Sequence, residues 1–229
     1  MAEAGVIDDY VTGLSRTLKG PRRPKLDLVT EARDSLLDAA EALEHDGLGR
    51  AEAELAAVEE FGSLEEIAPG YQEALSISAG RRLAAVVFVS VPLTTLAWSV
   101  VWRFYPEAPA AYAQWPGWYR PVSCGLDVLQ LFVGLLGGAA LFALGRGLRR
   151  IRRPRLVTRA LAVLVWTMLP ITIGLGLMLM YGYHHPAGLS AYPLSLGAEA
   201  LSFVFTFTQL YCATRCLTGT RRRPVPAQA

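Results

Sequence analysis

The sequence predicts an all-α protein, in which a small cytoplasmic helical domain is followed by a four-helix transmembrane bundle. The first observation is charge: residues 1–80 contain 17 acidic and 7 basic residues, whereas residues 81–229 contain 3 acidic and 15 basic ones. The second is hydropathy: the apolar residues of the second part gather in four stretches of about 20 residues, the length that a helix needs to cross a bilayer. Together they exclude a single soluble globule.

These compositions predict the domain boundaries. We expect an acidic helical domain at 1–80, a transmembrane domain at 81–218 and a cytoplasmic tail at 219–229. The four spans are expected at about 83–104, 122–145, 160–182 and 194–217. Each span should be a helix, because backbone amides in lipid must be hydrogen-bonded within the segment.

The distribution of arginine predicts the orientation of the spans. Thirteen arginines lie at the span ends on the same side of the membrane as the acidic domain. Only Arg103 and Arg120 lie at the span ends on the opposite side. Basic residues accumulate in cytoplasmic loops, and tyrosine and tryptophan, which are frequent in 105–121 and 183–193, gather at the headgroup level. We therefore expect a multi-pass protein of the plasma (inner) membrane with both termini in the cytoplasm.

Apolar residues recur with helical period throughout 1–78, which predicts four helices. The spacing of Ser63 and Glu66 is that of a capping box before the fourth of them. Pro69 and Gly70 should kink or interrupt that helix. The expected core of the domain includes Leu36, Leu55, Phe61 and Leu64.

Residues 57–68 read Ala-Val-Glu-Glu-Phe-Gly-Ser-Leu-Glu-Glu-Ile-Ala, and they follow a Pro/Arg linker and a long acidic segment with Leu-Leu-Asp-Ala-Ala. This order resembles the HAAS signalling domain, also called the permease-prefix domain, over residues 5–78. The resemblance implies a bacterial regulatory protein with several transmembrane helices, often encoded beside a PadR-like transcriptional regulator, and some relatives of this kind precede transporter permeases. It implies no catalytic residues, and Pro69 departs from the unbroken fourth helix that the family leads us to expect.

Two acidic residues, Asp127 and Glu199, fall inside the predicted spans. A carboxylate in a membrane is costly, so it is protonated, paired or exposed to a wet cavity. One interpretation is an intramembrane ligand or proton site, for which Arg103 is the nearest basic residue by depth. The other is a structural polar contact close to the membrane surface.

A second candidate site is the arginine-rich segment between the second and third spans. It could hold anionic lipid or dock the acidic domain, or it could serve only as the orientation signal. The candidate docking residues are Arg146, Arg149, Arg150, Arg152, Arg153 and Arg155.

The sequence contains no nucleotide-binding loop, no Ser/His/Asp arrangement and no zinc-binding motif, so we expect neither an enzyme nor a cofactor or metal. Direct nucleic-acid binding is not expected either, because a domain with this acidic excess repels phosphates. The expected function is a membrane-anchored signalling or regulatory protein whose domain at 1–80 binds a cytoplasmic protein, such as a PadR-like regulator. The alternative is a transporter, or an accessory or permease-like subunit of an ABC transporter. Membrane lipid is the other expected partner, and a homo-oligomer is left open.

Overall fold

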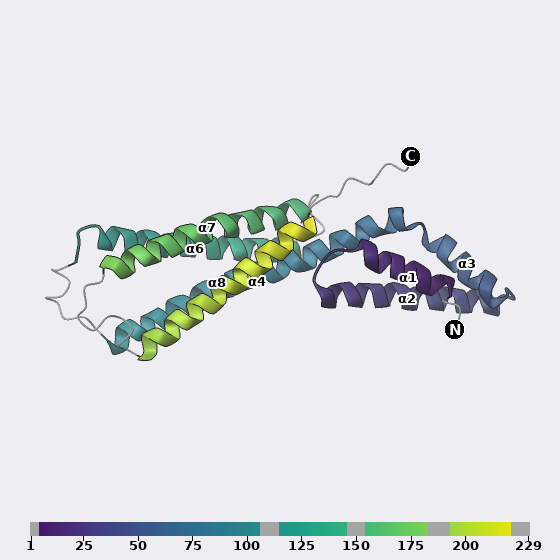
Figure 1. Ribbon diagram of the computed structural model, residues 1–229, viewed down its shortest axis with the longest axis horizontal. Coiled ribbons are helices and arrows are strands. Elements are labelled where there is room, and N and C mark those ends of the chain that lie inside the picture. The colour runs from purple at the N-terminus through teal and green to yellow at the C-terminus, as the bar shows by residue number, and fades with distance from the viewer. Residues whose placement is uncertain (1–4, 106–114, 146–153, 183–192, 221–229) are drawn as a thin grey trace. The chain divides into compact units, whose positions relative to one another are not determined.

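A computed structural model of the chain describes residues 5–105, 115–145, 154–182 and 193–220 (Figure 1). All the secondary structure in these residues is helical, so the all-α class is confirmed. The helices are α1 (Val6–Thr17), α2 (Arg22–His45), α3 (Arg50–Phe61), α4 (Leu64–Phe104), α6 (Tyr119–Gly145), α7 (Pro154–Gly182) and α8 (Pro193–Thr220).

The chain divides into two compact units. The N-terminal unit contains the described residues up to Ala79 together with those from Thr218 onward, and the bundle unit contains Gly80–Leu217. Helix α4 contributes residues to both units. The last residues of α8 group with the N-terminal unit, whereas the sequence predicts a separate tail at 219–229.

In the N-terminal unit, α1, α2 and α3 pack on one another and on the first turns of α4 around one apolar core. The spacing of apolar residues explains this packing, because residues three or four apart share one face of a helix. The core residues that α2 contributes in this way are Val29, Ala32, Leu36 and Ala40. Leu36 is fully buried, and Phe61 and Leu64 pack against the core.

Leu55 is not in that core, so this expectation is wrong: half of its surface is exposed. Helix α3 buries Ala53 and Ala57 instead, which are four residues apart and share a face. Leu55 lies two residues from each of them, about 200° around the helix, because each residue turns an α-helix by about 100°. The small alanines bring α3 close to the core, and the larger leucine faces outward.

The corner between α3 and α4 has the form that the sequence predicts for a helix start. Gly62 ends α3 with a φ of 104°, in the left-handed region that favours glycine. The Glu66 carboxylate accepts hydrogen bonds from the Ser63 hydroxyl at 2.9 Å and from the Ser63 amide at 3.1 Å. These bonds satisfy an amide that has no partner within the helix.

Helix α4 runs without a break from Leu64 to Phe104, so Pro69 and Gly70 do not interrupt it and that part of the expectation is wrong. A kink at these residues, the other form of the expectation, stays a prediction. Proline at position 69 lacks the amide that would bond the carbonyl of Glu65, a loss of one hydrogen bond in the second turn. Ala68 and Leu75 are buried on either side of it in the core. Their packing holds the segment helical through the proline.

Three helices of the described chain are long and apolar enough to cross a membrane: α4, α6 and α7. Their C-terminal ends, Phe104, Gly145 and Gly182, coincide with the C-terminal ends expected for the first three spans. Helix α8 covers the predicted fourth span and has 28 residues, but it is not among the three. Glu199, Gln209 and Arg215 lower its hydropathy.

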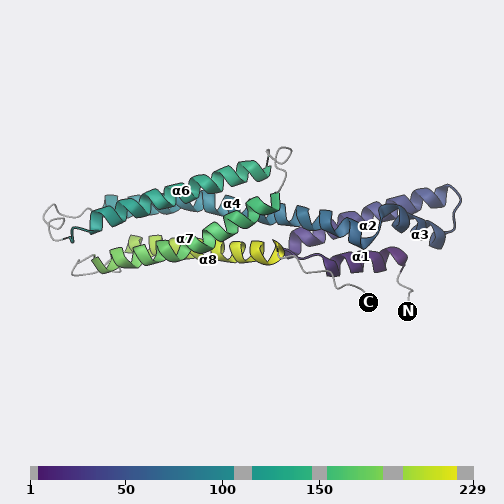
Figure 2. The same ribbon diagram turned by 90° about the horizontal axis from the view of Figure 1, so that it is seen from above.

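The helices of the bundle unit meet through small residues. Helices α6 and α7 lie side by side (Figures 1 and 2). On α6, a Cβ at Gly134 would lie 3.0 Å from Val91 of α4, and one at Gly137 would lie 2.8 Å from Val87. The missing side chains therefore permit the close approach of α4 and α6, as is common between membrane helices.

Candidate functional site

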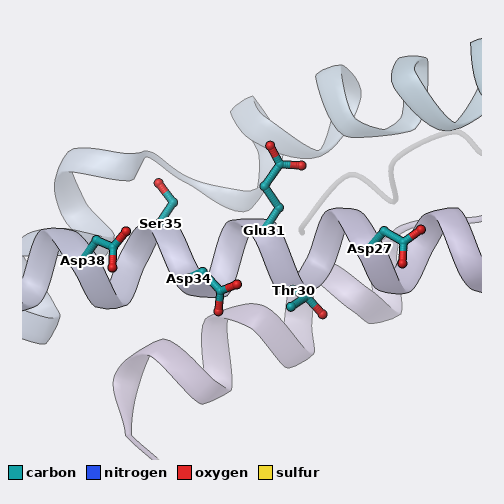
Figure 3. A pocket seen from close by; sticks show the side chains of 6 residues that line it. All are labelled: Asp27, Thr30, Glu31, Asp34, Ser35 and Asp38. Carbon is teal, nitrogen blue, oxygen red and sulfur yellow. The ribbon is translucent and has the colours of Figure 1, made fainter.

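One face of α2 carries a shallow acidic hollow on the surface of the N-terminal unit. Six exposed side chains line it, all from α2 (Figure 3). They are Asp27, Thr30, Glu31, Asp34, Ser35 and Asp38. Four of the six are carboxylates, so the hollow is strongly negative.

The spacing of α2 explains why these carboxylates gather. Positions 27, 31, 34 and 38 are separated by four, three and four residues, which places them on one face of a helix. The apolar residues Val29 and Leu36 lie on the opposite face and enter the core. Burial of one face thus holds the other in solvent along three turns.

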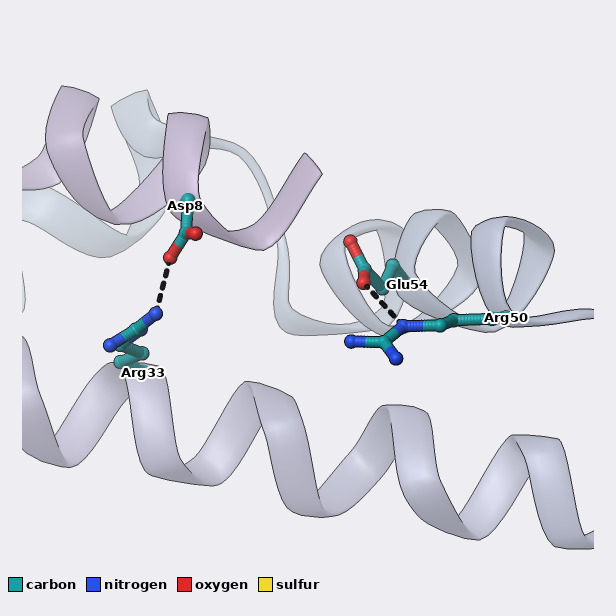
Figure 4. Close-up of polar contacts among 4 residues, drawn as sticks. All are labelled: Asp8, Arg33, Arg50 and Glu54. Atoms are coloured by element: carbon teal, nitrogen blue, oxygen red, sulfur yellow. Dashed lines mark hydrogen bonds and ion pairs between the residues drawn. The ribbon is translucent and has the colours of Figure 1, made fainter. Parts of the chain in front are cut away.

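The four carboxylates of the acidic hollow form no salt bridge with a cation of the described chain. The salt bridges lie elsewhere: Arg33 meets Asp8 at 2.7 Å, and Arg50 meets Glu54 at 3.6 Å (Figure 4). None of the four carboxylates in the hollow forms a salt bridge with a described residue. Exposed pairs such as Arg33 and Asp8 contribute little stability, and this one joins α1 to α2.

One carboxylate of the hollow, Glu31, also influences Tyr71 of α4. Burial and, after it, the negative charge of Glu31 raise the pKa of Tyr71. Four exposed carboxylates on a rigid helix attract cationic groups and repel phosphates. No three His, Cys, Asp or Glu residues in the described part of the chain are arranged to hold a metal ion. The arrangement suits recognition of a basic protein surface.

The predicted intramembrane residues lie on three different helices. Asp127 is exposed on α6, Glu199 is half-buried on α8, and Arg103 is exposed in the last turn of α4. Within the described ranges, no hydrogen bond or ion pair joins any two of them. An intramembrane site at these residues stays a prediction.

The arginine-rich segment is only partly described. Arg146, Arg149, Arg150, Arg152 and Arg153 lie outside the described residues. Arg155 lies in the first turn of α7 and is half-buried. Docking of lipid or of the acidic domain to this segment is therefore still a prediction.

Sequence reasoning did not single out the acidic hollow, although it noted the acidic excess of residues 1–80. The signal was present in the spacing: four carboxylates at i, i+4, i+7 and i+11, opposite an apolar stripe. A count of acidic residues by helix face, in place of a count by domain, would have found it.

Assignment of a function rests on the residues of this chain. No family model, curated protein or solved structure matches it. Two features carry an assignment: the acidic hollow of α2 and the long apolar helices of the bundle unit.

Proposed function

We propose that this chain is a membrane-anchored regulatory protein whose N-terminal unit binds a basic cytoplasmic partner protein. The acidic hollow of α2 is the observation that carries the proposal. It stands on a unit with its own apolar core, in a chain that also has three helices of membrane-spanning length. The anchor keeps the unit at the membrane, and the hollow recruits the partner to it.

Helix α8 is the fourth span in this proposal, and both termini lie in the cytoplasm. Two of its polar residues, Gln209 and Arg215, are accommodated in ways that suit a membrane helix. Gln209 donates a hydrogen bond of 2.6 Å to the Ser90 hydroxyl of α4. Arg215 lies over the ring of Tyr211, 5.3 Å from its centre, so its charge can reach the membrane surface while its stem stays apolar. The arginine bias orients the four spans.

A PadR-like transcriptional regulator is the partner that the resemblance of residues 57–68 to the HAAS domain implies. Charge supports the pairing, because a DNA-binding regulator presents a basic surface and the acidic hollow attracts one. Direct binding of nucleic acid by this chain would oppose like charges.

A second function, a transporter or an accessory subunit of an ABC transporter, is favoured by one observation. Asp127 lies in α6, one of the three long apolar helices, and Glu199 lies in α8, the predicted fourth span. The described residues supply neither carboxylate with a hydrogen bond or an ion pair. An acidic residue in such a place is commonly part of an ion or substrate path.

Charge reversal in the acidic hollow tests the main proposal. The variant Asp27→Lys/Asp34→Lys/Asp38→Lys is compared with wild type by the amount of protein that co-purifies with the full chain from native membranes. Three exposed charge pairs at up to about 1 kcal/mol each predict a loss of bound partner of about tenfold or more.

The matched control makes the same change of charge on α3, at three exposed glutamates: Glu52→Lys/Glu59→Lys/Glu60→Lys. It should retain the partner. Equal loss in both variants would contradict the proposal, and so would no loss in either. Capture of an ATP-binding subunit in place of a transcriptional regulator would favour the transporter function.

A further inference from the structure

Four exposed arginines of the bundle unit come from three helices: Arg81 and Arg82 from α4, Arg159 from α7 and Arg215 from α8. We refer to these four residues as the arginine belt. They are far apart in the sequence, and contacts between their helices bring them to one end of the bundle unit.

Helices α4 and α7 meet at the point where Arg81 and Arg159 leave them. Gly80 precedes Arg81, and a Cβ built on it would lie 2.9 Å from Cγ2 of Thr158 and 3.0 Å from Cδ1 of Leu144. Thr158 is fully buried and precedes Arg159. The bare backbone of Gly80 thus allows both arginines to project from adjoining turns.

Helix α8 brings its arginine to the same level. It runs antiparallel to α4 (Figure 1), and Gln209 is bonded to Ser90. From this contact, Arg82 is eight residues away along α4 and Arg215 is six residues away along α8, which is about 12 and about 9 Å in the same direction.

No acidic side chain of the described bundle unit offsets this charge. The acidic residues there are Asp127 and Glu199, and both lie in the parts of α6 and α8 that are remote from the belt. Arg81, Arg82 and Arg159 form no salt bridge with a described residue. These three arginines of the belt therefore present positive charge that no salt bridge with a described residue compensates.

The belt borders surface that lipid chains would cover. Leu156 and Val163, one turn to either side of Arg159, are 54% and 45% exposed. Tyr211 is 58% exposed, and its hydroxyl accepts a 3.2 Å hydrogen bond from Nε of Arg215. Charged groups beside large exposed apolar side chains lie where acyl chains end and headgroups begin.

We propose that the arginine belt binds the phosphate headgroups of anionic phospholipids. This inference rests on the proposed insertion of the bundle unit in a membrane, and it adds a lipid preference to it. A guanidinium can donate two parallel hydrogen bonds to one phosphate, and each basic residue at an anionic membrane surface adds attraction. Arginines that serve only to orient the spans would give no preference for one lipid over another.

The test uses the full chain reconstituted in vesicles of phosphatidylcholine with or without phosphatidylglycerol. The association of spin-labelled phosphatidylglycerol with the protein is measured against that of spin-labelled phosphatidylcholine. Wild type should prefer phosphatidylglycerol, and Arg81→Gln/Arg82→Gln/Arg159→Gln/Arg215→Gln should lower that preference by about fivefold or more, since one basic residue is worth about that factor. Free inorganic phosphate at millimolar concentration should not displace the labelled lipid.

Two control variants separate the belt from general effects. Arg103→Gln/Arg120→Gln removes exposed arginines from the opposite ends of the helices and should keep the preference. Arg81→Lys/Arg82→Lys/Arg159→Lys/Arg215→Lys keeps both the charge and the orientation signal and should keep most of it. If the glutamine variant does not fold, wild type and the lysine variant still test the proposal. In 0.5 M salt, the preference of both for phosphatidylglycerol over phosphatidylcholine should become weaker.

Flotation with pure phosphatidylcholine vesicles reports insertion separately. A protein that inserts but binds both lipids equally would overturn the lipid inference and leave the membrane function in place. A preference that survives in the glutamine variant, or that the Arg103/Arg120 variant loses, would overturn it as well. Failure to insert in any vesicle would refute the membrane proposal itself.

Discussion

The hydroxyl of Tyr10 on α1 donates a 2.9 Å hydrogen bond to the carbonyl oxygen of Gly62 at the corner between α3 and α4. The ring of Tyr10 also packs edge-on against Phe61, with 5.9 Å between the ring centres. Burial, with smaller contributions from Tyr71, Glu65 and Glu66, raises the pKa of Tyr10. One side chain therefore ties the first helix of the N-terminal unit to the corner that begins α4.

Tyr10→Phe should destabilise the N-terminal unit by about 0.5–1.5 kcal/mol, because it removes the hydrogen bond to Gly62 and keeps the ring contact with Phe61. Hydrogen exchange of α1 amides in the full chain measures the change. Tyr71→Phe is the control, since its hydroxyl makes no hydrogen bond with a described residue. Equal effects of the two substitutions would contradict a specific role for the Tyr10 bond.

The hydrogen bonds from the hydroxyl and then the amide of Ser63 lower the pKa of the Glu66 carboxyl below its ordinary value of 4.5. A carboxyl whose pKa is lower in the folded state than in the unfolded state adds stability to the fold. This stability is fully present above the pKa of the unfolded state, and it is lost as the pH falls through the pKa of the folded state. Wild type should thus weaken below about pH 4.5 more steeply than Glu66→Gln. Exchange of α4 amides as a function of pH tests this, with Glu65→Gln as the neighbour that should behave like wild type.

Leu36→Ala and Leu55→Ala make the same chemical change at positions of opposite burial. Leu36 is fully buried, so its truncation should cost about 2–5 kcal/mol, enough to unfold so small a unit. Leu55 is half exposed, and its truncation should cost about 1 kcal/mol or less. The two variants are compared by their unfolding in urea, which is monitored through the proteolysis of the N-terminal unit. A larger cost at Leu55 would mean that the face of α3 is assigned wrongly.

Gly137→Ala should destabilise the bundle unit by about 1–3 kcal/mol, because the new methyl would lie 2.8 Å from Cγ1 of Val87 and 3.1 Å from the backbone nitrogen of Phe88. The backbone atom cannot move aside cheaply. Gly176→Ala is the matched control, since no atom lies within 4 Å of its built Cβ, and it should be neutral or slightly stabilising. Thermal unfolding in detergent measures both.

The proposed four spans predict which engineered cysteines react in intact cells. With Cys124, Cys212 and Cys216 replaced by serine, cysteines at positions 109 and 188 should react with an impermeant reagent from outside. A cysteine at position 226 should react only after lysis. Reaction at 226 in intact cells would show that α8 does not span and that three spans place the termini on opposite sides.

Features that depend on local patterns were predictable. The C-terminal ends of α4, α6 and α7, the buried position of Leu36 and the bond between Glu66 and Ser63 each depend on residues within a few turns of one another. Three predictions were wrong or stay untested because they depend on contacts between residues that are far apart in the sequence. The burial of α3 depended on how closely its alanines approach α2, and the continuity of α4 through Pro69 depended on packing of residues on both sides. Whether Asp127 and Glu199 act together depends on contacts that no local pattern encodes.

The sequence by itself determined the helical class, the division near residue 80 and the apolar lengths of the long helices, because hydropathy and helical period act along the chain. Only the tertiary structure decided that Leu55 faces solvent, that Gly80 lies against Thr158 and that four arginines from three helices form one belt. These features come from side chains and backbones far apart in sequence that fit together in space, and the free energy of that fit depends on shapes that composition and spacing do not specify.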